Sequence, residues 1–181
     1  MPETTSTDSL LAASLIRDVP DFPKPGILFK DITPVLASAA AMHQIIDRFI
    51  AFATPKAPTI IVGIESRGFV FGMPLALEMS LPFIPVRKLG KLPAATIREE
   101  YALEYGTNTV EMHQDAIHPG DRVIIVDDLL ATGGTAAAAK RLVQRLGGEV
   151  VGFTFLIELG FLHGRLALPN DDILALLSYD D

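Results

Sequence analysis

The chain has 181 residues, of which 49% are hydrophobic, a net charge of −7 at pH 7 and no cysteine. This length predicts one globular domain, and the hydrophobic content excludes an intrinsically disordered chain. The negative charge argues against nucleic acid as the main partner, and the lack of cysteine excludes disulfides, thiolate metal sites and a cysteine nucleophile.

The chain begins with a polar stretch that lacks the basic and apolar regions of a secretion signal. We expect residues 1–8 to be a frayed tail. No apolar stretch of the sequence approaches the roughly 18 residues that a membrane span requires. These features predict a cytoplasmic protein that does not contact a membrane.

A short helix is predicted from residue 9 to residue 17. Pro20, Pro23 and Pro25 then force an extended or turning segment, because proline restricts its own backbone and that of the residue before it. Apolar residues recur at helical spacing from about residue 37 to residue 53, which predicts an amphipathic helix.

Short apolar runs predict strands at residues 59–63 and 83–86. Between them, the loop 64–68 leads into a helix that is predicted to end near residue 79. A further strand is predicted at residues 109–113, where apolar and polar residues alternate.

The stretch between the last two strands, residues 88–108, is polar and contains Gly90, Pro93 and Gly106. A connection of this length is usually functional, so we predict a lid here. The basic cluster at its start can attract a small anionic ligand in spite of the negative net charge. This cluster consists of Arg87, Lys88 and Lys91.

The most informative segment runs from residue 123 to residue 135. Residues 123–126 are wholly apolar, which is typical of a strand buried on both faces of a parallel sheet. Asp127 and Asp128 follow, and then a turn rich in glycine and threonine leads into an alanine-rich helix. Helix-start amides and the helix dipole favour anions, so this turn is predicted to bind a phosphate. The turn consists of Ala131, Thr132, Gly133, Gly134 and Thr135.

The acidic pair Asp127 and Asp128 would repel a phosphate placed directly on it. Beside a bound phosphate, the two carboxylates can accept hydrogen bonds from sugar hydroxyls or hold Mg²⁺ through its waters. The turn and the acidic pair together therefore indicate a phosphorylated, activated ribose. Taken alone, each piece could equally be a strand exit or a helix cap, whereas the uninterrupted string favours a ligand site.

A helix at about residues 133–146 and strands at about 149–157 and 173–178 complete the chain. Because strands and helices alternate, we predict an α/β fold with a mostly parallel, twisted sheet flanked by helices. Ligands of such sheets bind at the carboxyl ends of the strands, where the loop 64–68 and the phosphate turn both fall.

The string from residue 123 to residue 135 resembles the 5-phosphoribosyl 1-diphosphate signature of type I phosphoribosyltransferases. Four further segments occur in the order expected for the adenine phosphoribosyltransferases and resemble that branch of the family. They are residues 21–34, 65–72, 86–93 and 103–106. The resemblance runs from about Leu15 to the C-terminus.

The resemblance implies a single domain of residues 1–181 with the type I phosphoribosyltransferase fold, in which residues 20–34 form a small N-terminal hood and residues 88–108 a flexible lid. It implies transfer of the 5-phosphoribosyl group from 5-phosphoribosyl 1-diphosphate to adenine, giving AMP and diphosphate in purine salvage. It also implies a homodimer, and Mg²⁺ bound mainly through substrate and water near Asp127 and Asp128.

The resemblance further implies roles for residues outside the phosphate turn. Glu104 is expected to be the acidic group nearest the reacting nitrogen, and Tyr105 is expected to belong to the lid. The diphosphate is expected at Glu65, Ser66, Arg67, Arg87, Lys88 and Lys91. Adenine is expected at Leu28, Phe29 and Lys30; many relatives have arginine in place of Lys30, and a bidentate side-chain contact would not survive that exchange.

Two alternatives stay open from the sequence. The first is a phosphoribosyltransferase for another base, such as hypoxanthine or xanthine. The second is a non-catalytic regulator that senses 5-phosphoribosyl 1-diphosphate. Such regulators usually carry a nucleic-acid-binding appendage or have lost the lid and its acid, whereas here Glu104 is present and the tail before Leu10 is short.

Overall fold

The structure is a computed structural model, and it describes residues 10–102 and 106–180. Contacts within the chain divide it into two compact units, Met1–Arg48 and Phe49–Asp181, and each is described by itself. Within the described ranges, no helix has both the length and the apolar character needed to cross a membrane.

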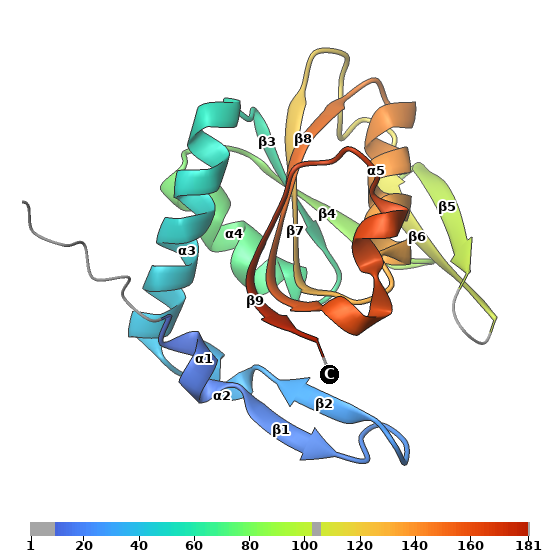
Figure 1. The fold of residues 1–181 in the computed structure, drawn as a ribbon. Helices are drawn as coiled ribbons and strands as arrows, with labels where there is room; N and C mark the ends of the chain where they lie inside the picture. Colours follow the sequence, from blue (N-terminus) through green and yellow to red (C-terminus); the bar gives the residue numbers. More distant parts are fainter. Residues whose placement is uncertain (1–9, 103–105, 181) are drawn as a thin grey trace, which may run out of the picture. The chain divides into compact units, whose positions relative to one another are not determined.

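The first unit contains a β-hairpin between short helices (Figure 1). Helix α1 (Ala12–Leu15) precedes strands β1 (Arg17–Pro20) and β2 (Leu28–Asp31), which pair antiparallel, and helix α2 (Thr33–Leu36) follows. The hairpin takes the place of the extended or turning segment that the prolines predict. The helix that was predicted at residues 9–17 ends earlier in the structure, at Leu15, because Arg17 already belongs to strand β1. Helix α3 (Ala39–Ala53) comes next, and its residues from Phe49 onward belong to the second unit.

The second unit is built on a seven-stranded sheet with the strand order β5-β6-β4-β3-β7-β8-β9. Strands β4, β3, β7, β8 and β9 are parallel, whereas β5 and β6 run antiparallel at one edge, which confirms a mostly parallel sheet. The strands are β3 (Ile60–Ile64), β4 (Phe83–Lys88), β5 (Thr96–Ala102), β6 (Thr107–His113), β7 (Arg122–Leu130), β8 (Glu149–Leu159) and β9 (Ile173–Tyr179).

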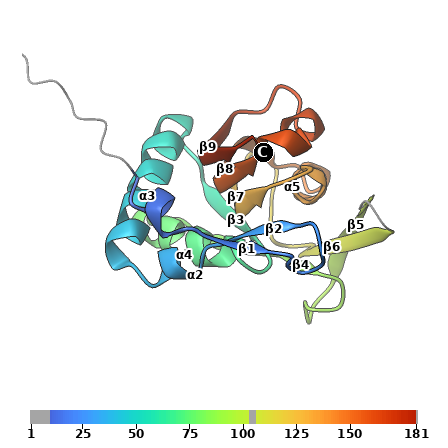
Figure 2. The same cartoon turned by 60° about the horizontal axis from the view of Figure 1, so that its bottom comes forward.

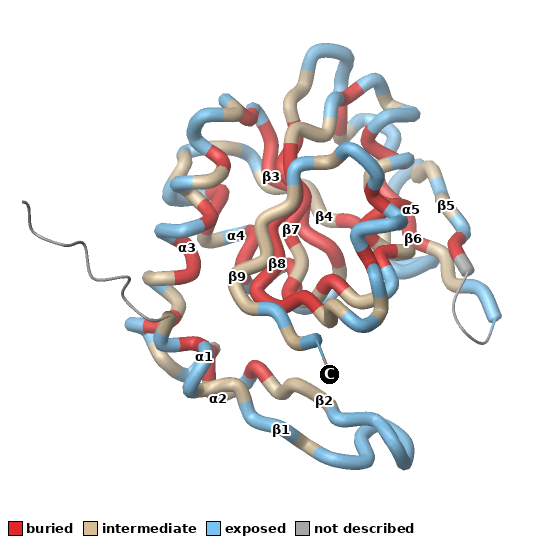
Figure 3. The backbone as a smooth tube through the Cα atoms, viewed as in Figure 1, coloured by how far each residue is buried: buried red, intermediate tan, exposed pale blue. Residues whose placement is uncertain are grey.

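Helices α4 (Gly68–Glu78) and α5 (Gly134–Arg145) cover opposite faces of this sheet (Figures 1 and 2). Alternate residues of β7 point to the two faces, so Val123 and Ile125 share a core cluster with Leu142 of α5. The central strands form the buried interior, as Figure 3 shows. The 3₁₀ helices η1 (Thr54–Lys56), η2 (Gly160–Leu162) and η3 (Gly164–Ala167) lie in the connections.

Two further differences from the sequence-based prediction affect the candidate site. The strand predicted to end at Val126 continues to Leu130, so the acidic pair lies on the strand and not after it. The stretch predicted to be a long lid connection contains strand β5, which pairs with β6 from Thr96↔His113 to Ala102↔Thr107. Because β5 contains several charged residues, the sequence does not show the apolar pattern from which the other strands were predicted.

Candidate active site

The acidic pair lies near the carboxyl end of β7, between strands β3 and β8. Asp128 is buried, with 5% of its surface exposed, and its Oδ2 lies 2.6 Å from Nε of Arg67. The Oδ1 atom of Asp127 accepts a hydrogen bond from the backbone N–H of Asp128 at 2.9 Å. The two carboxylates therefore differ in their surroundings: Asp128 forms an ion pair with the guanidinium of Arg67, whereas Asp127 accepts a backbone hydrogen bond.

Burial shifts the pKa values of this pair. Burial raises the pKa of Asp127 well above its usual value, and the neighbouring charge of Asp128 raises it further. Burial also raises the pKa of Asp128, although Arg67 offsets part of the effect. A cation or hydroxyl donors bound here would favour the charged carboxylates and oppose this rise of the pKa values.

A glycine allows the start of α4 to approach the end of β7. A Cβ atom on Gly68 would lie 2.5 Å from the carbonyl oxygen of Val126 and 3.1 Å from Oδ1 of Asp127. Any side chain at residue 68 would therefore separate the two elements. This close approach brings Arg67, the residue before the helix, to Asp128.

The predicted phosphate turn forms one wall of a hollow of about 70 Å³. Gly133 has φ +80, a left-handed conformation that glycine adopts readily. The N–H of Ala137 donates to the Gly133 carbonyl at 2.9 Å. The amides of the helical residues before Ala137 therefore precede the first i→i−4 hydrogen bond of α5. All five predicted turn residues line this hollow, together with Asp127, Leu129, Leu130 and Ala136.

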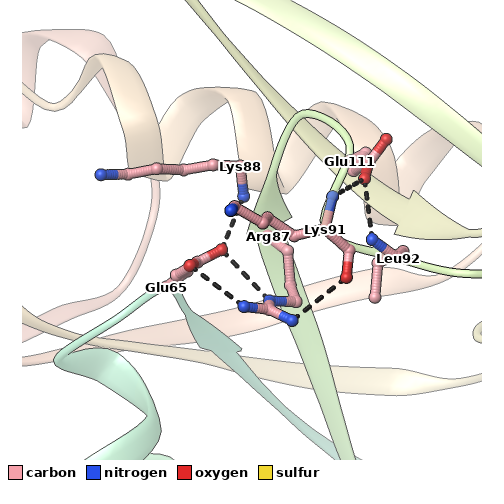
Figure 4. A network of polar contacts seen from close by, with 6 residues as sticks. All are labelled: Glu65, Arg87, Lys88, Lys91, Leu92 and Glu111. Atoms are coloured by element: carbon pink, nitrogen blue, oxygen red, sulfur yellow. Dashed lines mark hydrogen bonds and ion pairs between the residues drawn. The ribbon is translucent and has the colours of Figure 1, made fainter.

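A second loop of the site follows β3, which lies between β4 and β7 in the sheet. The Glu65 carboxylate accepts bonds from Nε and Nη2 of Arg87, both at 3.1 Å, and from the Lys88 amide at 2.9 Å (Figure 4). Arg87 also donates from Nη1 to the carbonyl of Lys91 at 3.1 Å. The peptide bond between Glu65 and Ser66 is cis.

These contacts refine the residues predicted for the diphosphate. Ile64 and Val86 are partners in the parallel register of β3 and β4. The residues that follow them, Glu65 and Arg87, therefore lie at neighbouring strand ends. The Glu65 side chain, however, accepts hydrogen bonds from Arg87, and a carboxylate repels a phosphate. Its position makes it a residue that orients Arg87. Burial alone would raise the pKa of Glu65, but the bonds from Arg87 and Lys88 outweigh it, so the pKa is lowered.

Glu111 on β6 is a residue of this region that the sequence reasoning missed. It is 1% exposed, and it accepts hydrogen bonds from the amides of Lys91 and Leu92 at 3.0 and 3.1 Å (Figure 4). The Thr96 hydroxyl donates to its other oxygen at 3.3 Å. Burial alone would raise the pKa of Glu111, but these donors lower it below its usual value. A charged residue between Val110 and Met112 was the signal available in the sequence.

The hairpin of the first unit contains the residues predicted for adenine. Val19, Phe22, Phe29 and Asp31 line an apolar hollow of about 240 Å³. The rings of Phe22 and Phe29 meet edge to face, with centroids 5.0 Å apart. Phe22 was not among the predicted residues, although it precedes a proline in the hood segment.

The other two residues predicted for adenine, Leu28 and Lys30, are next to Phe29 in the sequence but do not line this hollow. Leu28 is 49% exposed, and Nζ of Lys30 lies 2.7 Å from Oδ1 of Asp18. The backbone and side chain of Thr33 and the side chain of Arg17 donate to Asp31 and lower its pKa to about 2.

Glu104 and Tyr105 lie outside the described residues. The strands on either side of them are described, and β5 is attached to α5 through Glu99. The Glu99 carboxylate forms ion pairs with Arg141 and Arg145 of α5, and Arg145 also donates to the carbonyl of Arg98 at 2.7 Å.

The carboxylates of Asp127 and Asp128 have the chemistry to bind a magnesium ion. Within residues 10–102 and 106–180, no three His, Asp or Glu side chains cluster as a metal site. The acidic pair offers two carboxylates, and Asp128 already pairs with Arg67. Mg²⁺ is usually bound by one or two carboxylates together with substrate phosphates and waters, so this pair fits it.

Known proteins resemble this chain over most of its length. The family described as "Phosphoribosyl transferase domain" matches residues 33–168. An adenine phosphoribosyltransferase of Synechococcus sp. is 56% identical over 167 residues, which cover 92% of this chain and 98% of that protein. The crystal structure of adenine phosphoribosyltransferase from Thermoanaerobacter pseudethanolicus has 50% identity and a TM-score of 0.90, covering 93% of this chain and 98% of that one. The enzyme from Saccharomyces cerevisiae, complexed with D-2,5-dideoxy-2,5-imino-altritol 1,6-bisphosphate and adenine, has 42% identity and a TM-score of 0.87, covering 92% and 96%.

Proposed function

The chain belongs to the adenine phosphoribosyltransferase family, and from this premise we propose how its residues act. The reaction is the transfer of the 5-phosphoribosyl group from 5-phosphoribosyl 1-diphosphate to adenine, which gives AMP and diphosphate in purine salvage. A purine nitrogen displaces diphosphate at the anomeric carbon. The site must therefore anchor the 5′-phosphate, hold the ribose, neutralise the leaving diphosphate and exclude water.

The 5′-phosphate is anchored in the hollow beside the turn at residues 131–135. Amides at the start of α5, the helix dipole and the hydroxyls of Thr132 and Thr135 supply the favourable interactions. The ribose hydroxyls donate to Asp127 and Asp128, which are next to this hollow. The observation that carries the proposal is that Asp127 lines the same hollow as the whole predicted turn.

The leaving diphosphate binds between the loop after β3 and the end of β4. Arg67, Arg87, Lys88 and Lys91 provide positive charge there. Glu65 fixes the orientation of Arg87 through two hydrogen bonds, which reduces the entropy lost on binding. A bound Mg²⁺ would neutralise further charge on the diphosphate, and Asp127 is the carboxylate best suited to hold it through water.

Adenine binds at the hairpin of the first unit, against the aromatic hollow. Phe29 and Phe22 offer the faces and edges that a purine ring favours. Backbone groups near Leu28 and Lys30 read the edge of the base. Because Lys30 is paired with Asp18, we assign the base contact to the main chain and not to the Lys30 ammonium.

Glu104 stays the predicted acidic group at the reacting nitrogen, and Tyr105 stays a predicted lid residue. Glu104 would accept a proton from the purine or stabilise the developing positive charge. Residues 88–108 would supply the lid, which excludes water from the activated sugar. The Glu99 ion pairs attach strand β5, which lies within these residues, to α5.

The protein is proposed to act as a homodimer in the cytoplasm. Helix α4 supports the dimer, because Val70, Met73 and Leu77 are spaced to share one helix face and are 38%, 45% and 70% exposed. Apolar residues concentrated on one helix face are typical of a surface that a second subunit covers.

The proposed reaction and base preference are tested by one competition assay. The protein is incubated with Mg²⁺, 5-phosphoribosyl 1-diphosphate and equal amounts of radiolabelled adenine, hypoxanthine and xanthine. We expect AMP as the dominant nucleotide. If no nucleotide forms, the regulator alternative gains support, whereas a dominant hypoxanthine or xanthine product would overturn the assignment of the base.

A further inference from the structure

The phosphate turn rests on a second loop that none of the assigned roles includes. We call residues 163–168, which contain η3, the support loop. A Cβ atom on Gly133 would lie 2.3 Å from the carbonyl oxygen of Gly164. A Cβ atom on Gly164 would lie 2.2 Å from the carbonyl oxygen of Ala131. The two backbones are therefore in reciprocal contact, with a glycine on each side.

The support loop is tied to the sheet through Arg165. Its guanidinium forms three hydrogen bonds with the Glu158 carboxylate, at 2.7 to 3.0 Å, and donates to the carbonyl of Ile173 at 3.4 Å. Glu158 lies on β8, where its register partner on β7 is Leu130, the residue immediately before the phosphate turn. The pair thus connects the loop beneath the turn to the strand beside the turn.

Leu130 completes this arrangement. Its Cγ and Cδ1 atoms are each 3.0 Å from the position of a Cβ atom on Gly164. Leu130 is 1% exposed, so its side chain has little room to move away. A side chain at residue 164 would therefore press on both the backbone and the buried side chain that lead into the turn.

We propose that the support loop sets the shape of the 5′-phosphate site, with Gly164 and Arg165 as positioning residues that act through the turn. This inference rests on the proposed function. A phosphate bound by several amides requires their directions to match its oxygens, so a displacement of the turn by a fraction of an ångström weakens every contact at once. The leaving diphosphate is assigned to other strand ends, and its binding does not depend on this loop.

The variant Gly164→Ala tests the proposal by isothermal titration with two ligands, ribose 5-phosphate and Mg²⁺-diphosphate. We expect the Kd of ribose 5-phosphate to rise about tenfold or more, while the Kd of diphosphate stays within about twofold. In turnover, the KM for 5-phosphoribosyl 1-diphosphate should rise more than kcat falls. Equal affinity of wild type and variant for ribose 5-phosphate would overturn the proposal.

The matched control is Gly160→Ala in η2. Both glycines have φ angles outside the left-handed region, so both substitutions test space alone. At Gly160 the added Cβ would meet the end of the exposed Asp180 side chain, which can turn away. Gly160→Ala should therefore keep wild-type affinity for both ligands. A loss equal to that of Gly164→Ala would show that the effect is not specific to the contact with the turn.

Arg165 variants keep the proposal testable if Gly164→Ala does not fold. Arg165→Met should weaken ribose 5-phosphate binding several-fold, and Arg165→Lys, which retains one ionic contact to Glu158, should recover part of the loss. Unchanged binding in Arg165→Met would again overturn the proposal. If wild type itself fails to bind ribose 5-phosphate, the proposed function fails and not only the role of this loop.

Discussion

At the scale of single residues, Glu111 shows how a buried charge can organise a neighbouring loop. Its carboxylate accepts hydrogen bonds from the amides of Lys91 and Leu92, so the loop that contains Lys91 is fixed from the side of the neighbouring strand. The alternation of apolar and polar residues predicts the strand itself but not the burial of Glu111, because alternation alone does not reveal that a loop covers the polar face.

We predict that Glu111→Gln destabilises the protein in a pH-dependent manner. The amide keeps one acceptor but cannot accept the Thr96 hydroxyl through its nitrogen, and it lacks the negative charge. Loss of a charged, buried acceptor costs about 1–3 kcal/mol in the free energy of unfolding. Because the folded pKa of Glu111 lies below its usual 4.5, the wild type has this advantage fully above about pH 4.5 and loses it as the pH falls further.

Urea unfolding of wild type and variant between pH 3.5 and pH 8, as a rough working range, measures this difference. Glu100→Gln serves as the control, since Glu100 is an exposed residue of β5. The control should change the free energy of unfolding by less than about 0.5 kcal/mol. A difference for Glu111→Gln that grows below pH 4.5 would contradict the assignment of a lowered pKa.

At the scale of elements, the sequence predicted best where the pattern is local. The apolar run before Asp127 and the glycines after it depend on neighbours in the chain, so the strand, the turn and the helix α5 were all found. Strand β5 was missed, because its residues include Arg98, Glu99 and Glu100, and their pairing partners on β6 are distant in sequence. The contact between Gly133 and Gly164 could not be predicted from local patterns either, since these residues are 31 positions apart in the sequence.

Helix α4 gives the prediction at this scale. If its exposed apolar face is the dimer surface, Leu77→Lys should shift the protein from dimer to monomer in sedimentation velocity, because a buried unpaired ammonium is costly. Leu166→Lys is the control, since Leu166 is 81% exposed on η3. It should leave the dimer intact. A dimer that survives Leu77→Lys, or a wild type that sediments as a monomer, would exclude this face.

At the scale of the whole molecule, the residues proposed for the phosphoribosyl group and those proposed for adenine belong to different units. The second unit carries the acidic pair, the phosphate turn and the basic residues assigned to the diphosphate. The first unit carries the aromatic hollow assigned to adenine. The sequence predicted candidate site residues in both units. It could not predict that Glu65 pairs with Arg87 and Asp128 with Arg67, because ion pairs depend on the three-dimensional placement of strand ends.

The central claim is that one ribose 5-phosphate spans the turn and the acidic pair. A crystal structure with bound AMP tests it most directly. We predict the 5′-phosphate within hydrogen-bond distance of the amides at Gly133, Gly134 and Thr135, and the ribose hydroxyls on Asp127 and Asp128. A nucleotide bound elsewhere, with the turn empty, would contradict the account.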